Sequence, residues 1–268
     1  MKGKNEKITY SYNKGRELLN KKISVIMPAY NLQGKISNSI NTVDKILRNI
    51  TKDYEIIVID DGSTDNTYQE IVSNGNKRVI PLRNAINMGK GFSVRRGVLR
   101  STGEYIIMLD ADMEIKYSDI ISYIKALKYY DIVIASKRHP KSTYDAPIMR
   151  KIASFAFNAL VNILTGVRVS DTQSGLKAFR AKPAKIIMRI ILVKRYAFDV
   201  EVLAIAKLLN LKICEMPVKI KLCKRFPLKQ ILYMLIDLLG ITYRLRIIKW
   251  YQQNLNKIKA KYKPIIKL

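Results

Sequence analysis

Residues that build disulfide scaffolds, zinc sites and membrane spans are scarce in this sequence. Its 268 residues include two cysteines, Cys214 and Cys223, and one histidine, His139. Because no further Cys/His cluster accompanies them, a disulfide framework and a zinc site are excluded, and we expect reduced thiols and a solvated loop histidine. The longest stretch without a charged residue is the sixteen residues 152–167. A membrane span needs about 20 mostly apolar residues, so we expect no transmembrane helix.

Acidic residues are also scarce: 21 Asp and Glu stand against 49 Lys and Arg, a net charge of +28 at pH 7. This balance favours anionic partners, namely nucleic acid, an acidic membrane or phosphorylated ligands, and charge alone does not choose among them. A hydrophobic content of 48% excludes a disordered chain. No secretory leader is recognisable, so a reducing cytoplasm is the expected compartment.

The chain then shows the alternation of strands and helices that is typical of an α/β sheet. After a basic tail at 1–22, short β-branched runs recur, separated by amphipathic stretches such as 36–50, whose apolar residues share one helical face. The pattern predicts an open, mostly parallel sheet flanked by helices, with ligands bound at the carboxyl ends of the strands. The expected strands are 23–27, 55–59, 78–82, 105–109 and 131–135.

Beyond Pro140 the same domain continues, and we place its end near residue 225. We expect helices near 147–165 and 198–209, a polar segment at 170–180 and a strand at 212–220. Part of the first helix forms an apolar stripe from Ile152 to Ile163, which is either core or a face lying along a membrane.

Residues 226–268 form a C-terminal extension. The last 57 residues hold fourteen Lys or Arg and only two acidic residues. An apolar face that includes Leu238, Leu239 and Leu245, flanked by Arg244 and Arg246, predicts a basic amphipathic helix. Such a helix either lies on an anionic membrane surface or packs on the domain with its basic face in water.

Two acidic strand ends carry the most informative chemistry. Asp110 and Asp112 follow an apolar strand as Asp-x-Asp, and alternate side chains of an extended segment share a face, so their carboxylates suit a Mg²⁺ or Mn²⁺ ion that also binds a diphosphate. Glu114 continues the alternation as a candidate third ligand. A polar loop that merely ends a strand is the alternative. Asp60 and Asp61 end another strand, where they can accept hydrogen bonds from a base or ribose.

Two further segments extend this pattern. Pro28 and Tyr30 end the first strand with a rigid turn and a ring for stacking, and Lys90 lies between two glycines at the opening of a helix, where it can meet a phosphate.

Together and in this order, these segments resemble the family 2 glycosyltransferases, which have the GT-A nucleotide-sugar fold. The matching pieces are PAYN at 28–31, VIDDGSTDNT at 58–67, NMGKG at 87–91 and DADME at 110–114. DTQSGLKAF at 171–179 and YAFDVEVL at 196–203 are most similar to the dolichyl-phosphate sugar transferases, and their form favours the glucosyl over the mannosyl branch. The resemblance covers roughly residues 23–220.

The resemblance implies a set of site residues. The nucleoside is held by Pro28, Tyr30 and Asp61, with Lys90 and Ala111 beside it; the metal is held by Asp110, Asp112 and Glu114; the phosphates face Lys137, Arg138 and Arg150, with Gln173 and Asp171 near the acceptor. Two departures stand out: Leu32 and Gln33 replace the usual Glu after PAYN, and Lys219, Lys221, Lys224 and Arg225 stand in for a basic motif that has no clean match.

The implied activity is inverting transfer of glucose, or else mannose, from UDP-glucose or GDP-mannose to a polyprenyl or dolichyl phosphate, for glycoconjugate or protein glycosylation. The expected enzyme is peripheral on the cytoplasmic face of a membrane. A phosphate monoester is already largely a dianion at neutral pH, so no general base is needed, and Asp171 serves as a base only if the acceptor is a hydroxyl. Asp199 either belongs to the site or caps a helix.

Other classes fit less of the sequence. A transferase acting on a glycan or protein hydroxyl is the main alternative. A nucleic-acid-binding protein explains the charge but needs no Asp-x-Asp, so no nucleic acid is expected. A non-catalytic relative should have lost the metal carboxylates, which this chain keeps.

Overall fold

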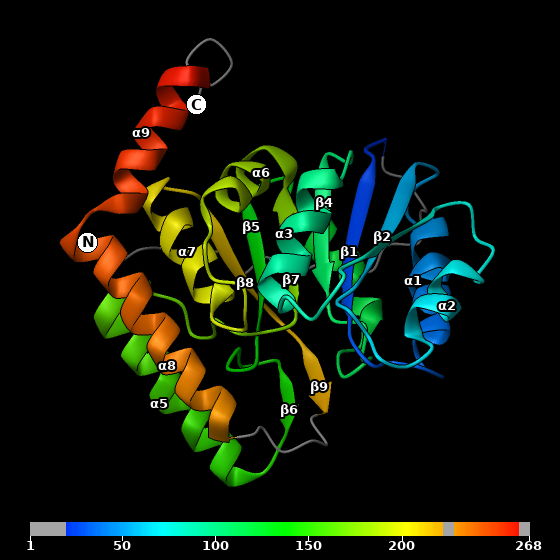
Figure 1. The fold of residues 1–268 in the computed structure, drawn as a ribbon, viewed down its shortest axis with the longest axis horizontal. Coiled ribbons are helices and arrows are strands. Elements are labelled where there is room, and N and C mark those ends of the chain that lie inside the picture. Colours follow the sequence, from blue (N-terminus) through cyan, green and yellow to red (C-terminus); the bar gives the residue numbers. More distant parts are fainter. Residues whose placement is uncertain (1–19, 222–227, 263–268) are drawn as a thin grey trace.

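The computed structural model describes residues 20–221 and 228–262 and contains a central seven-stranded sheet with helices on both faces (Figure 1). The spatial order is β3-β2-β1-β4-β7-β5-β8. The strands of this sheet are β1 (Ile23–Ala29), β2 (Tyr54–Asp60), β3 (Val79–Arg83), β4 (Tyr105–Leu109), β5 (Ile132–Ser136), β7 (Leu176–Arg180) and β8 (Ile213–Pro217). A separate two-stranded ribbon pairs β6 (Thr143–Asp145) with β9 (Lys219–Lys221) in parallel.

The five strands predicted from β-branched runs are confirmed within two residues at each end. Strands β1, β2, β3 and β4 run parallel, and β5 runs parallel to β8. All seven residues of β2 are buried, as expected for a strand covered on both faces. The α/β fold class is therefore as predicted.

Strand β7 corrects the prediction of a polar segment at 170–180. It lies antiparallel between β4 and β5, in the middle of the sheet. Its charged residues conceal it in the sequence: Lys177 is 1% exposed and forms an ion pair with Asp199, and Arg180 Nε donates to the Leu127 carbonyl at 2.9 Å. A run interrupted by charges therefore forms a buried strand, because the charges find partners.

The helices form two layers. On one face of the sheet, α3, α6 and α7 share a core that also receives α5, α8 and α9; on the other, α1 and α4 cover the sheet (Figure 1). Helix α6, directly after β7, was not predicted. The helices are α1 (Ile36–Arg48), α2 (Thr67–Val72), α3 (Lys90–Arg100), a 3₁₀ turn (Tyr117–Asp119), α4 (Ile120–Ala126), α5 (Ile148–Thr165), α6 (Ala181–Ile190), α7 (Phe198–Leu208), α8 (Leu228–Thr242), a π-helical turn (Tyr243–Ile247) and α9 (Trp250–Tyr262).

The stripe from Ile152 to Ile163 on α5 faces outward rather than into the core. Ile152, Phe155 and Ile163 are 55%, 66% and 72% exposed, whereas Phe157 and Val161 are buried. Of the two interpretations of this stripe, plain core is therefore wrong.

The C-terminal helices pack on the domain, with α8 beside α5 (Figure 1). Leu238 and Leu245 join the core, but Leu239, predicted on the same face, is 61% exposed. Arg244 and Arg246 lie in the π-helical turn and bind the domain, through the Glu201 carboxylate at 3.7 Å and the Ile163 carbonyl at 3.0 Å. The exposed side of α8 is accordingly apolar rather than basic.

Some expectations concern residues outside the described ranges. These are the tail at 1–19, together with Cys223, Lys224 and Arg225. The domain boundaries at 22 and 225 stay predictions. Within residues 20–221 and 228–262, no helix is both long and apolar enough to cross a bilayer.

Candidate active site

The predicted site residues gather at the edge of the sheet where the parallel strands β1, β2, β4 and β5 end. Pro28 lies in β1, and Tyr30, just after it, is 46% exposed. The turn that follows is fastened to the loop before α2, because the Asn31 amide donates to Ser63 Oγ at 3.0 Å and the Gln33 amide to Asp65 Oδ2 at 3.1 Å. Tyr30 is thus an accessible ring on a fixed turn, as stacking of a base requires.

Asp61 shapes the neighbouring loop. Its buried carboxylate accepts four hydrogen bonds, from Asn84 Nδ2 at 2.7 Å, Ser93 Oγ at 2.9 Å, Met88 N at 3.0 Å and Gly89 N at 2.8 Å. These bonds hold the segment that carries Lys90 at the start of α3. The structure therefore shows Asp61 supporting this loop, and its contact with a nucleoside stays a prediction.

Lys90 and Asp110 form an ion pair where α3 begins and β4 ends. Lys90 Nζ lies 2.6 Å from Asp110 Oδ1. Burial acts to lower the pKa of Lys90, but the carboxylates of Asp110 and Asp199 outweigh it, so the pKa is raised and the ammonium persists. Ala111, next in the chain, is buried, and its carbonyl accepts from Ser39 Oγ at 2.7 Å.

Asp110 and Asp112 fit a divalent cation. Asp110 is partly exposed and Asp112 is exposed, with Oδ1 of Asp112 accepting from the Glu114 amide at 3.2 Å. In the described ranges, no three His, Cys, Asp or Glu side chains gather closely enough to hold a metal, so Glu114 does not complete a three-carboxylate set in this conformation. Two hard carboxylates open to water are nevertheless the donor set with which Mg²⁺ binds a diphosphate.

Asp171 and Lys137 form a buried ion pair just past the end of β5. Lys137 Nζ lies 2.7 Å from Asp171 Oδ2, which also accepts from the Lys137 amide at 3.0 Å. Burial acts to raise the pKa of Asp171, but Lys137 and the backbone N–H groups lower it overall. Burial lowers the pKa of Lys137 against the attraction of Asp171. Asp171 therefore positions Lys137, and a carboxylate so engaged is a poor general base.

We predict that Asp171→Asn lowers the free energy of unfolding by about 3 kcal/mol at pH 7, because it leaves Lys137 buried without its counter-charge. A lowered pKa in the folded state means that the carboxylate stabilises the fold above about pH 4 and loses this effect as pH falls further. The difference between wild type and variant, measured by urea unfolding from pH 7 to pH 3, should shrink below that value. A constant difference would contradict the ion pair, and Asp145→Asn, at an exposed carboxylate, is the control.

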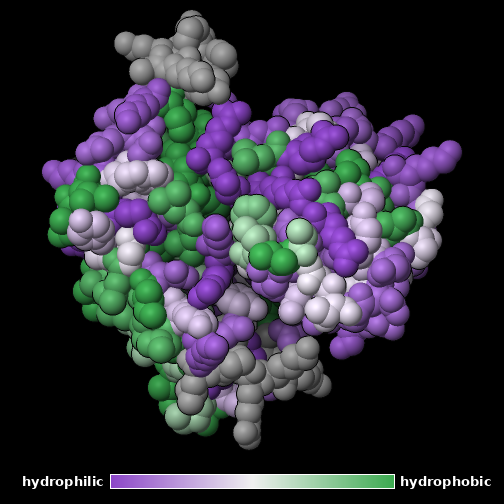
Figure 2. Space-filling view, viewed as in Figure 1, coloured by the Kyte–Doolittle hydropathy of each residue, from purple (hydrophilic) through white to green (hydrophobic). Residues whose placement is uncertain are grey.

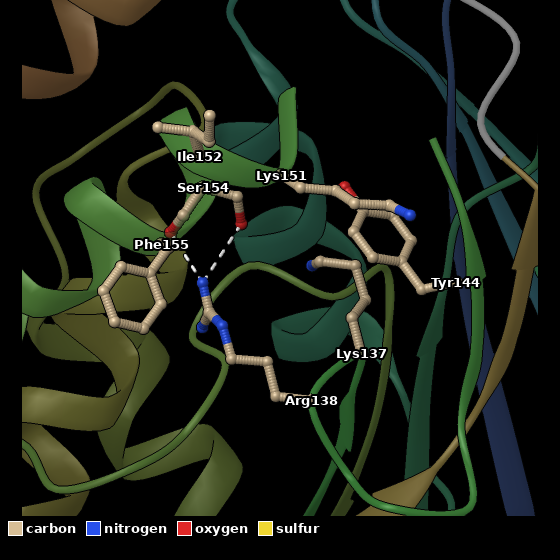
Figure 3. Close-up of a pocket in the computed structure, with 7 residues that line it drawn as sticks. All are labelled: Lys137, Arg138, Tyr144, Lys151, Ile152, Ser154 and Phe155. Carbon is tan, nitrogen blue, oxygen red and sulfur yellow. Dashed lines mark hydrogen bonds between the residues drawn. The ribbon is translucent and has the colours of Figure 1, made fainter. Parts of the chain in front are cut away.

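A pocket of about 350 Å³ opens beside this pair (Figure 3). Arg138 is fixed in it by three acceptors, because its guanidinium donates to the Ser170 carbonyl and, at 2.8 and 3.4 Å, to the carbonyl and hydroxyl of Ser154 on α5. None of the ion pairs found among the described residues involves Arg138. The lining residues are Lys137, Arg138, Tyr144, Lys151, Ile152, Ser154 and Phe155.

Other residues of this region were predicted or missed. Arg150 lies in the first turn of α5, and the Gln173 side chain lies 3.9 Å from Met234 Sδ on α8. Lys151, Tyr144 and Ser154 were missed, since only the fold brings them to Lys137. The Lys177–Asp199 ion pair was missed as well, although both residues lie in the motifs at 171–179 and 196–203.

Comparison with known proteins identifies the fold and the family. The model of Glycosyl transferase family 2 matches residues 24–187. The chain belongs to this family. The dolichyl-phosphate beta-glucosyltransferase of Dictyostelium discoideum is 32% identical over 250 residues, which are 85% of this chain and 76% of that protein. The mouse protein of the same name is 33% identical over 247 residues, 84% and 76% of the two chains.

Solved structures show the same architecture. Glucosyl-3-phosphoglycerate synthase from Mycobacterium tuberculosis, in complex with Mn²⁺, UDP-glucose and glycerol 3-phosphate, has a TM-score of 0.62 at 17% identity and covers 84% of this chain and 79% of its own. The GT-A fold and the family 2 glycosyltransferase expected from the sequence are thus confirmed. The individual site residues stay predictions.

Proposed function

We propose that this glycosyltransferase moves glucose, with inversion, from UDP-glucose to dolichyl phosphate or a related polyprenyl phosphate. Two relatives at 32% and 33% identity carry the name dolichyl-phosphate beta-glucosyltransferase. The observation that carries the proposal is one short segment: residues 170–175 hold Asp171 against Lys137 at one end and Gly175 against Asp110 at the other. A cationic pocket and the carboxylates that we propose as metal ligands therefore lie at the two ends of a single loop.

At the donor end, the chain's own residues bind and orient the nucleotide sugar. Tyr30 offers its exposed ring to the base, and Lys90 faces the diphosphate from the start of α3. Asp110 and Asp112 are the residues that would hold a divalent cation, Mg²⁺ or Mn²⁺, which when bound neutralises charge on the departing diphosphate. A structural neighbour with Mn²⁺ and UDP-glucose bound supports the use of a divalent cation.

At the acceptor end, Lys137 and Arg138 bind the lipid phosphate. Arg138 suits this task because its planar guanidinium is held rigid by carbonyl groups and keeps its full charge. The phosphate oxygen attacks the sugar without a general base, since a phosphate monoester has a second pKa of about 6. Asp171 keeps Lys137 in place, which is its role in the reaction.

The apolar outer side of α5, α8 and the π-helical turn, which we call the α5–α8 face, lies against a membrane surface in this proposal. Figure 2 shows the hydrophobic surface gathered over these helices. Ile152 and Phe155 belong both to the face and to the pocket, so a polyprenyl chain leaving the phosphate site passes directly onto apolar surface. The face consists of Ile148, Met149, Ile152, Phe155, Ile163, Leu232, Ile236, Leu239, Tyr243 and Ile247, all more than half exposed.

The net charge suggests which membrane. A chain with a charge of +28 is attracted to anionic lipids, which are enriched in the cytoplasmic leaflet. We propose that nucleotide sugars reach the site from the same side. We therefore place the protein peripherally on the cytoplasmic face, with no nucleic acid among its partners.

We predict that Ile236→Ser with Leu239→Ser weakens binding to liposomes containing phosphatidylserine by about 10-fold or more, because each large apolar side chain contributes roughly 1.5 kcal/mol or more when buried. Cosedimentation measures the change. Val72→Ser with Ile86→Ser removes two equally exposed side chains from a region outside this face and should leave liposome binding unchanged. An equal loss in both double variants would contradict the assignment of the face.

The activity itself is tested with purified protein, a divalent cation, dolichyl phosphate and labelled UDP- or GDP-sugars, followed by counting of label in an organic extract. The proposal expects label in lipid from UDP-glucose. Label from GDP-mannose would change the donor, and release of nucleotide only with soluble glycans would indicate a hydroxyl acceptor instead.

A further inference from the structure

A lysine in the middle of the sheet is the unexplained feature of this fold. Lys177 lies in β7 between Met108 of β4 and Ile134 of β5, and it is 1% exposed. Both sheet neighbours are apolar, and an apolar side chain would fill the same place without the cost of burying a charge. Packing therefore gives no reason for a lysine here.

The ammonium of Lys177 has two partners. Nζ donates to the Ser174 carbonyl at 2.7 Å and lies 2.9 Å from Asp199 Oδ1. Asp199 stands in the first turn of α7 but makes no capping hydrogen bond, so its predicted alternative role as a helix cap is not seen. The buried pair joins the loop 170–175 to the start of α7.

The first consequence concerns Asp110. The Gly175 carbonyl, next to the carbonyl that Lys177 holds, accepts from the Asp110 amide at 3.2 Å. A Cβ atom on Gly175 would lie 2.1 Å from Asp110 Oδ2, so the backbone of Gly175 is in close contact with this carboxylate. Because Lys177 holds the Ser174 carbonyl, it also fixes the position of the Gly175 backbone.

The second consequence concerns Lys90. Helices α3 and α7 meet at their first residues, because a Cβ atom on Gly91 would lie 2.7 Å from Phe198 Cβ. The neighbouring residues Lys90 and Asp199 are close enough for Asp199 to stabilise the Lys90 ammonium. Negative and positive charges thus alternate from the site into the core, in the order Asp110, Lys90, Asp199 and Lys177.

We propose that Lys177 and Asp199 are positioning residues for the donor end of the site. Lys177 fixes the backbone of Gly175 and thereby the position of the Asp110 carboxylate. Asp199 keeps Lys90 in place when a cation and a diphosphate compete for Asp110. The inference rests on the proposed function, in that it requires a nucleoside diphosphate at Lys90 and Asp110. It assigns to the pair a task in donor binding in addition to its part in the fold.

The test measures the affinity of the full chain for UDP in the presence of Mn²⁺ by calorimetry, together with thermal unfolding. Asp199→Asn and Lys177→Met should each weaken UDP binding by about 10-fold or more, the usual effect of losing a group that orients a ligand-binding carboxylate. The double variant should be about as weak as either single one, because the two residues act as a unit.

Glu55→Gln is the matched control. Glu55 is also a buried carboxylate, bonded to Ser24 Oγ at 2.5 Å and Thr102 N at 2.6 Å, but it lies near the opposite, amino end of the strands. This variant should lose thermal stability and keep the affinity for UDP.

Two results would overturn the inference: the first refutes only the positioning role, and the second refutes the proposed function as well. If Asp199→Asn and Lys177→Met lose stability as Glu55→Gln does but bind UDP like wild type, the pair is only structural. If Lys177→Met does not fold, Asp199→Asn, which preserves side-chain shape, decides alone. If wild type itself binds neither UDP nor GDP with Mn²⁺, the proposed function fails and the inference fails with it.

Discussion

Asp112→Asn is expected to lower kcat/KM for sugar transfer by about 10³-fold, which corresponds to a barrier roughly 4 kcal/mol higher. Asp112 is exposed at the end of β4, so the substitution removes a ligand charge without opening a cavity in the core. With that charge gone, the site holds a divalent cation less tightly, and negative charge on the departing diphosphate is left without compensation. Thermal unfolding of the variant should match wild type.

The metal assignment also predicts how the activity of Asp112→Asn depends on the Mn²⁺ concentration. Raising the Mn²⁺ concentration should restore part of the activity, because Asp110 remains as a ligand. Asp53→Asn, at an exposed carboxylate before β2 that lies 3.8 Å from Lys22, is the control and should transfer sugar at the wild-type rate. Full activity of Asp112→Asn at low Mn²⁺ would refute the assignment.

The parts of the fold that the sequence predicted are those in which each residue contacts its near neighbours or a continuous apolar layer. Strands β1, β2 and β4 are each built around a short run of apolar, mostly β-branched residues, and burial on both faces is the reason for that composition. Strand β7 was not predicted because its burial depends on Asp199, which is 22 residues further along the chain than Lys177. A charge that is satisfied from a distant element cannot be distinguished from a surface charge by local pattern.

The site divides in the same way. The pattern of strand ends predicted Asp110 and Lys137 at one edge of the sheet, and the family resemblance added Asp171. It did not reveal that Asp61 is bonded to the neighbouring segment before α3, or that Arg138 is immobilised by carbonyl groups of residues 154 and 170. These contacts depend on where loops return to the sheet, which periodicity does not encode.

The outward face of α5 and α8 shows a related limit. Helical periodicity groups apolar residues into stripes, but it does not say which stripe is covered. On α8, Leu238 is fully buried and Leu239 is 61% exposed, although both were assigned to one apolar face. Tertiary packing alone decides which of two adjacent leucines is left for a membrane or another partner.

Arg138→Gln is expected to raise the KM for dolichyl phosphate by about 10- to 100-fold, because a hydrogen bond to a charged group contributes roughly 1.5–3 kcal/mol. Gln keeps a polar side chain next to Ser154 but removes the positive charge that is held over the pocket (Figure 3). The affinity for UDP with Mn²⁺ should not change, because Arg138 follows β5 and belongs to the acceptor end.

The separation of these two effects distinguishes a phosphate acceptor from a hydroxyl acceptor. If the pocket binds the lipid phosphate, added salt should weaken the binding of dolichyl phosphate more in wild type than in Arg138→Gln, since the variant has less charge to screen. Arg168→Gln, at an exposed arginine between α5 and β7, is the matched control and should leave the KM unchanged. An Arg138→Gln enzyme with wild-type KM for dolichyl phosphate would show that Arg138 does not bind the lipid phosphate.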